Sequence, residues 1–161
     1  MADKISHPRI ILAGLAGGAA MNLALLLTFR LLGFGARGDG ILITSPAQSK
    51  KLIAVWTELH PLPLVVQEPL TIIVGLLGFG LLHAYVFHWL RPALPRGVLR
   101  SALAFGGLVF STMFLFWEFF TPFNMFGEPL SLIALELAFW VLIALADGLA
   151  IAALIGGGTR Q

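Results

Sequence analysis

The sequence predicts an all-α membrane protein whose four transmembrane helices form two parallel helical hairpins related by a pseudo-twofold axis. Hydrophobic residues make up 58% of the 161 residues and charged residues 11%, whereas soluble domains carry about 25% charged residues. Four apolar runs are each long enough to cross a hydrocarbon core of about 30 Å. A pattern of Trp, Glu, Pro and Glu-Pro-Leu occurs twice. We therefore expect residues 1–161 to form a single transmembrane domain.

The expected spans cover residues 10–32, 69–90, 98–120 and 129–155. We interpret the first as a retained helix and not as a cleaved signal peptide, because the apolar run is long and no small-x-small site closes it. The last span ends where three consecutive glycines begin, a sequence typical of a helix C-terminus.

The loop between the first two spans begins with a Gly-rich, polar stretch at residues 33–45. Ser45 and Pro46 then have the pattern of a helix N-cap followed by proline at the first helical position. The next residues place Leu52 and Trp56 on one face. The segment is too short to span, so we expect an interfacial amphipathic helix anchored by Trp56.

The repeated pattern indicates an internal duplication. Trp56 to Thr71 and Trp117 to Ser131 have the same order of residues, and each stretch links an outgoing span to a returning one. The two halves, about 1–95 and 96–161, would then have the same orientation. The alternative is that Trp gathers at membrane interfaces and Glu at helix N-termini without any duplication.

Basic residues predict the orientation, since cytoplasmic loops carry an excess of Lys and Arg. Six lie on the side of the termini and of the second turn: Lys4, Arg9, Arg91, Arg96, Arg100 and Arg160. Four lie on the opposite side: Arg30, Arg37, Lys50 and Lys51. We expect both termini in the cytoplasm, with a bacterial inner membrane as the location.

Composition also excludes several classes of function. The chain has no cysteine, which excludes disulfides and thiolate metal sites. A formal charge of +2 is too small and too dispersed to indicate nucleic acid as a partner. No Ser-His-Asp order, phosphate loop, dinucleotide fingerprint or HExxH motif is present, so no catalytic residue is proposed.

Carboxylates at the two hairpin tips are the weak candidates for a metal site. If the tips meet around the pseudo-axis, a cation could bind among Glu58, His60, Glu68, Glu118 and Glu128, with Asn124 beside them. The simpler interpretation is helix capping. Glu68 and Glu128 each precede a proline that starts a span, where a carboxylate accepts from free backbone N–H groups.

Polar residues inside the spans need partners, because polar groups in hydrocarbon cost several kcal/mol. We expect Glu136 and Asp147 to share one face of the fourth span, three helical turns apart. Structural pairs would join Asn22 with Glu136, His83 or His88 with Asp147, and Arg30 with Glu118. The alternative is a polar track from Glu118 through Glu136 to Asp147 for protons or a small cation.

A haem inside the monomer is not expected. His83 and His88 are about 140° apart around a helix and cannot ligate one metal from the same face. No other span contains a histidine. A haem shared across a homodimer stays open.

Aromatic residues concentrate around the third span and its loop. They indicate an interfacial belt or a groove for a lipid tail, quinone, carotenoid or other isoprenoid. The surface consists of Trp56, Phe116, Trp117, Phe120, Phe123, Phe126 and Trp140. We predict a non-catalytic accessory or lipid-binding protein that contacts the bilayer and either other membrane subunits or a second copy. A small proton or cation transporter is the first alternative, and an enzyme acting on a lipid the second.

Overall fold

Four long helices dominate the protein, as a computed structural model of the chain describes it for residues 5–156. Every regular element in this range is helical, and the four long helices are apolar enough to cross a membrane. The predicted four-span architecture is therefore confirmed at this level. The spans are α1 (His7–Leu25) with the π-helical η1 (Leu26–Gly33), α5 (Leu70–Leu90), the third span described next, and α8 (Leu130–Ile155).

The third span changes its helical type along its length. It consists of α6 (Val98–Val109), η2 (Phe110–Phe114), α7 (Leu115–Glu118) and η3 (Phe119–Met125), where η2 and η3 are π-helical. Pro122 lies inside η3 and cannot donate a backbone hydrogen bond, which disfavours a regular α-helix there. The π-helix η3 continues past the proline. This span therefore ends at Met125 and not at the predicted residue 120.

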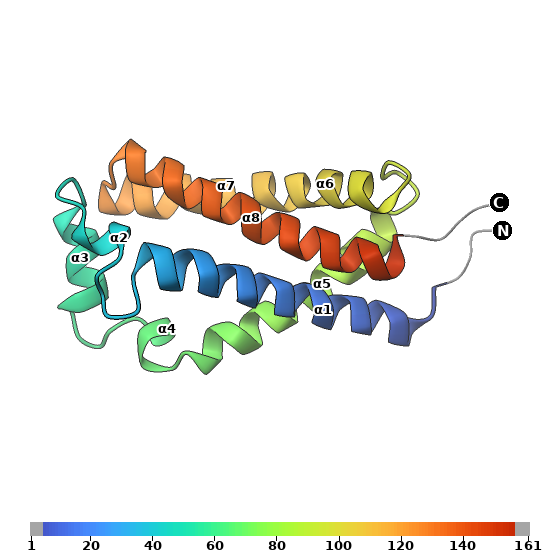
Figure 1. Ribbon diagram of the computed structural model, residues 1–161, viewed down its shortest axis with the longest axis horizontal. Helices are drawn as coiled ribbons and strands as arrows, with labels where there is room; N and C mark the ends of the chain where they lie inside the picture. The colour runs from blue at the N-terminus through green and yellow to red at the C-terminus, as the bar shows by residue number, and fades with distance from the viewer. Residues whose placement is uncertain (1–4, 157–161) are drawn as a thin grey trace.

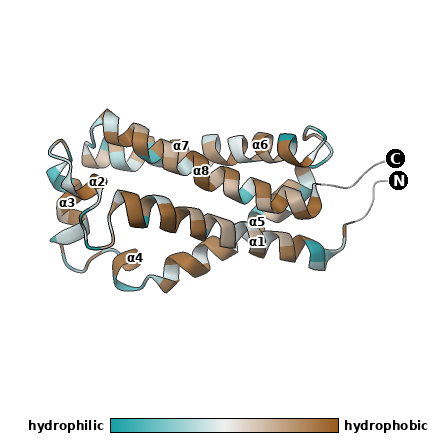
Figure 2. Ribbon diagram, viewed as in Figure 1, coloured by the Kyte–Doolittle hydropathy of each residue, from teal (hydrophilic) through white to brown (hydrophobic). Residues whose placement is uncertain are grey.

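Both hairpin tips lie at the same end of the molecule (Figure 1). We name this the loop end. It carries α2 (Ile41–Thr44), α3 (Lys50–Thr57), α4 (Leu64–Gln67) and the linker between η3 and α8. The opposite, turn end carries the start of α1, the α5–α6 turn and the end of α8. Hydrophobic residues cover the long helices between the two ends, and hydrophilic residues gather mainly at α3 and the turns (Figure 2).

The spans pack as a row more than as a closed bundle. Helix α1 packs along α5 on one side and along α8 on the other, and α8 packs along α6. Helix α5 reaches the third span mainly near the turn end, where the Phe87 and Phe105 rings meet edge to face with centroids 5.2 Å apart. Helix α5 and the third span are therefore edge helices, each supported along its length by one neighbour.

Glycines bring the backbones together within both hairpins. A Cβ added at Gly80 of α5 would lie 2.3 Å from the Gly14 carbonyl oxygen and 2.3 Å from the Gly18 nitrogen of α1. In the other hairpin, a Cβ added at Gly148 would lie 2.8 Å from the Ala102 carbonyl oxygen. Small residues of this kind allow close helix crossings in membranes, where packing replaces the hydrophobic effect.

The loop-end segment differs in detail from the prediction. Helix α3 begins at Lys50, with Ser49 as its extended N-cap residue, and not at Pro46. Ser45 instead ends α2, a short helix that the Gly-rich stretch did not predict. The Ser49 hydroxyl donates to the carbonyl of Phe126 in the other hairpin, so a tertiary contact accompanies the true start of the helix. The placement of α3 at a membrane interface stays a prediction.

Candidate functional site

Buried ionisable side chains form two groups inside the molecule. The first, which we name the acid cluster, consists of Glu118, Glu128 and Glu136 near the loop end. The second is the pair of His83 and Asp147, closer to the turn end. The three glutamates expose 1%, 1% and 6% of their surface and Asp147 exposes 0%. Intramembrane acids that avoid lipid in this way are candidates for function.

The centre of the acid cluster is a contact between two carboxyl groups from different spans. Glu118 of α7 and Glu136 of α8 lie within hydrogen-bonding reach of each other. The indole N–H of Trp140, one turn after Glu136, donates to Glu118 Oε1. Because an ionised carboxylate only accepts, a hydrogen bond between two carboxyl groups requires a proton on one of them. The two carboxyl groups are therefore placed to share a proton.

Glu128 extends the cluster to the loop end. It lies in the linker outside the spans and accepts a 2.6 Å hydrogen bond from Gln48 Nε2. The same amide also donates to the carbonyl of Leu42, at 2.9 Å. Burial raises the pKa of Glu128 above its ordinary value, and the hydrogen bond from Gln48 opposes part of that rise.

Several buried carboxyl oxygens have no donor. Glu118 Oε2, Glu128 Oε2 and Asp147 Oδ1 have no hydrogen-bond partner among the described residues, unless a carboxyl proton supplies one. An unsatisfied buried acceptor costs about 1–3 kcal/mol, and more when it is charged. These oxygens are therefore the open acceptor positions of the two groups.

Aromatic rings close around the acid cluster. Phe114 stacks on Trp140 with centroids 4.4 Å apart and planes 11° apart, and Phe29 of η1 contacts the same indole at 4.6 Å. Phe29 also meets Phe139 edge to face at 5.3 Å. This aromatic packing lowers the local dielectric constant, which strengthens the electrostatic interactions of the carboxyl groups.

The second group joins α5 to α8 beneath α1. His83 Nδ1 and Asp147 Oδ2 lie 2.7 Å apart, so the predicted pairing of Asp147 with a histidine of the second span is confirmed. The other carboxyl oxygen lies against Gly17 of α1, where an added Cβ would approach it to 2.4 Å. Phe105 borders the imidazole edge to face, with centroids 6.1 Å apart. The pair thus ties three spans together.

An apolar layer separates the two groups. Glu136 and Asp147 share one buried face of α8, but they are about 16 Å apart at 1.5 Å per residue. Ile143 and Met21 are buried between these levels, at 0% and 1% exposure. No hydrogen bond between described residues joins the acid cluster to the pair. The predicted polar track is therefore interrupted in this conformation.

Two predicted pairs are wrong. Asn22 donates to the carbonyls of Gly18 and Ile73, at 2.9 and 3.2 Å, and no hydrogen bond joins it to Glu136. Helices α1 and α8 are antiparallel, with Gly17 against Asp147 and Phe29 against Trp140. This register places Asn22 roughly two turns from the level of Glu136.

Arg30 does not pair with Glu118. Its guanidinium donates to the carbonyls of Gly35 and Ala36, at 2.6 and 3.3 Å, where the chain leaves η1. The turn that follows η1 presents these carbonyl groups close to the side chain. Local hydrogen bonds thus take the place of the predicted ion pair.

The hairpin tips do not form the convergent ligand set considered from the sequence. Glu58, His60, Glu68 and Asn124 are exposed, whereas Glu118 and Glu128 are buried. The His88 side chain is half-buried, and its Nδ1 has no described partner. Within residues 5–156, no three His, Cys, Asp or Glu side chains are placed to hold a metal ion.

The predicted aromatic surface divides into two parts. Phe116, Trp117 and Phe120 are exposed on the third span at 63%, 51% and 55%, and Phe116 stacks on Phe120 with centroids 5.6 Å apart. The remaining members, Trp56, Phe123, Phe126 and Trp140, are half-buried. Trp140 belongs to the acid cluster and not to the surface; its spacing of four residues from Glu136 was the available sequence signal.

Gln48 is the site residue that sequence reasoning missed. Nothing in its neighbourhood distinguishes it from an ordinary polar loop residue, because its partner Glu128 lies 80 residues away. The fold and this site together define a four-span integral membrane protein with buried carboxyl groups. Comparisons with protein-family models, with curated proteins and with solved structures give no match.

Proposed function

We propose that the protein is a small proton-linked transporter or channel component, in which the acid cluster takes up and releases a proton. The burial of Glu118, Glu128 and Glu136 in one cluster, with Trp140 donating to Glu118, carries this proposal. Neighbouring like charges repel strongly in an apolar interior, so a shared proton would stabilise the cluster. A change in hydration would release it. A purely structural role would be filled more stably by apolar residues of similar size.

The packing favours a proton over a larger cation. The rings of Phe29 and Phe114 lie against Trp140 at 4.6 and 4.4 Å, which leaves the indole faces covered. In the described part of the chain, no set of three ligating side chains is arranged for a metal. A proton needs no coordination shell and can bind at an unpartnered carboxyl oxygen.

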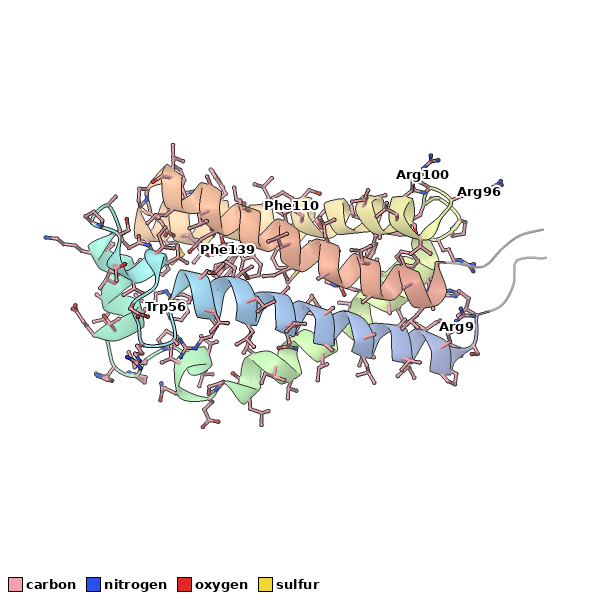
Figure 3. All side chains as sticks on the ribbon, in the orientation of Figure 1. Arg9, Trp56, Arg96, Arg100, Phe110 and Phe139 are labelled. Carbon is pink, nitrogen blue, oxygen red and sulfur yellow. The ribbon has the colours of Figure 1, made fainter. Side chains whose placement is uncertain are left out.

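We place both termini in the cytoplasm of a bacterial cell, with the loop end outside. Arg9, Arg96 and Arg100 group at the turn end, whereas Trp56 lies at the loop end (Figure 3). An excess of arginine is typical of cytoplasmic ends. Lys4 and Arg160, which contribute to the predicted asymmetry, lie outside the described residues.

We also propose that the hairpins arose by duplication and that a pseudo-twofold axis relates them. Each contains a glycine-to-glycine crossing, through Gly80 in the first and Gly148 in the second. Each outgoing span ends in π-helical segments, η1 in one and η3 in the other. The copies have diverged at the tips, because Glu128 is buried and its counterpart Glu68 is exposed.

Reconstitution tests the proposed function. Vesicles that enclose a pH-sensitive dye should acidify under an imposed potential when they contain the protein, and Glu136→Gln should reduce the rate at least tenfold. Glu68→Gln, which removes an exposed carboxylate at the same end, is the matched control and should retain the rate. Infrared spectroscopy should show a protonated carboxyl band that Glu136→Gln removes. Wild-type vesicles that behave like protein-free vesicles would refute the proposal.

A second candidate, an accessory or lipid-binding subunit, is favoured by the edge position of the third span. Only α8 supports this span along its length, and its aromatic residues Phe116, Trp117 and Phe120 are exposed. Such a face suits another membrane subunit, a second copy, or an isoprenoid or quinone. Purification in a mild detergent followed by native mass spectrometry tests this; a bare monomer with no added mass would count against it.

A further inference from the structure

We propose that the segment from Ile41 to Thr57, which contains α2 and α3, is a lid that closes the acid cluster at the loop end and opens to admit protons. This inference rests on the proposed function for its purpose, although the movement itself can be tested separately. It assigns a role to Gln48 and Ser49, two uncharged polar residues that lie outside the spans.

Two hydrogen bonds hold the lid to the opposite hairpin. Gln48 donates to Glu128 at 2.6 Å, and the Ser49 hydroxyl donates to the carbonyl of Phe126. We name these two bonds the latch. Both reach the linker that positions Glu128, so the lid contacts the acid cluster directly. The latch is also the only described set of hydrogen bonds between this segment and the second hairpin.

The lid packs against the rest of the protein through a small number of apolar side chains. Leu42 is fully buried at 0% and Leu52 nearly so at 4%, and Leu42 lies where a Cβ on Gly33 would approach it to 2.8 Å. The remaining anchor is the contact of Trp56 with Phe34, whose ring centroids are 4.8 Å apart. Since Phe34 belongs to the first hairpin, this anchor can hold the lid while the latch opens.

The ends of the lid suit a hinge movement. Before it, Gly35 and Gly38 both have φ +77, a left-handed conformation that glycine adopts without strain. After it, Pro61 and Pro63 interrupt the backbone hydrogen bonding that would otherwise extend α3. Apart from the buried Leu42 and Leu52, the segment between them makes few contacts with the spans. Regions with so few buried contacts open at low free-energy cost.

Opening the latch would hydrate the acid cluster from one side only. Glu128 faces Gln48 on the lid and lies close enough to Glu118 and Glu136 for their charges to interact. Among residues 5–156 no Lys or Arg forms an ion pair with it; the one ion pair described is His83 with Asp147. Water entering at Glu128 would therefore be the nearest solvent for all three carboxyl groups. The apolar layer at Met21 and Ile143 would still close the opposite side.

Chemical labelling tests the lid without relying on transport. A water-soluble carbodiimide with an added amine nucleophile, applied from the loop end, marks accessible carboxyl groups, and mass spectrometry of peptides measures the rate at each glutamate. The exposed Glu58 and Glu68 react in every variant and serve as internal references. Gln48→Ala and Ser49→Ala should each raise labelling of Glu128 and Glu118 about tenfold, because each removes one hydrogen bond of the latch.

The matched control is Gln67→Ala. The Gln67 amide donates to the carbonyl of Leu62 at the same end, so this variant loses an equivalent bond that does not touch the linker. Its labelling of Glu118 should equal that of the wild type. Hydrogen exchange should also accelerate in residues 41–57 of the Gln48 and Ser49 variants while α1 and α8 stay protected, which separates lid opening from unfolding.

Two results would overturn the lid. One is unchanged labelling of Glu118 in both latch variants; the other is an equal increase in Gln67→Ala. A different result would refute the proposed function. If the wild type shows no proton flux but the latch variants label faster, the segment is a lid and the protein has no proton pathway. Flux in the wild type with unchanged labelling would keep the pathway and reject the lid.

Discussion

Replacing Gly80 by alanine should separate α1 from α5, because the two backbones are already in contact there. The new Cβ would lie 2.3 Å from the Gly14 carbonyl oxygen and 2.3 Å from the Gly18 nitrogen, whereas ordinary contact begins at 3.4 Å. The helices must therefore move apart by about 1 Å, a shift that neither backbone can absorb by a rotamer change. Overpacking of this kind typically costs about 1–3 kcal/mol.

Gly78, two residues earlier on the same helix, provides the control. A Cβ added there meets nothing within 4 Å, so Gly78→Ala should show only the gain in helix propensity, up to about 1 kcal/mol. The two variants gain the same helix propensity, so their free energies of unfolding should differ by the overpacking cost alone, about 1–3 kcal/mol. Reversible unfolding in mixed micelles, followed by tryptophan fluorescence, measures this difference. Equal stabilities would refute the close crossing of α1 and α5.

Three further variants test the second hairpin and the acid cluster. Trp140→Phe keeps an aromatic ring but removes the donor to Glu118, and should lower the free energy of unfolding by about 1–3 kcal/mol; an unchanged value would mean that the indole bond contributes nothing. Burial raises the pKa of Glu128 above 4.5, so its stabilising effect is complete below that pH and is lost as pH rises towards the folded-state pKa. Glu128→Gln should accordingly flatten the fall in stability with rising pH in an unfolding titration, and a slope equal to that of the wild type would contradict this. Gly106→Ala, whose Cβ would lie 3.0 Å from the Ala144 carbonyl oxygen, should destabilise more than Gly107→Ala, where nothing lies within 4 Å; comparing the two melting curves checks this, and equal curves would argue against a tight α6–α8 crossing.

Hydropathy and helix signals were sufficient for the four spans, because burial in lipid requires long, apolar, internally hydrogen-bonded segments. They located the fourth span to within a residue of its observed start at Leu130 and its end at Ile155. The sequence also predicted that Glu136 and Asp147 share one face of the fourth span, because the helical repeat alone determines which residues of a helix share a face. The extension of the third span to Met125 was not predicted, because a proline normally ends a helix and only the observed π-helical coil carries the chain past Pro122.

The partners of the polar residues depended on the tertiary structure. The sequence indicates that Glu118, Glu136 and Asp147 need partners, and it offers His83 as one candidate partner for Asp147. Glu118 contacts Trp140 and Glu136 and not Arg30. Arg30 instead donates to the carbonyl groups of Gly35 and Ala36 in the turn that follows it. Helix crossings also set the register between spans, which one sequence does not contain.

The sequence alone determined that this is a helical membrane protein with costly buried acids, because those properties depend on residue type and on spacing along one helix. Only the tertiary structure decided that Glu118 meets Glu136, that Gln48 reaches Glu128 and that Glu58 and Glu68 stay exposed. Each of these depends on the distance between segments far apart in the chain. That distance is fixed by glycine crossings and by the antiparallel register of α1 and α8.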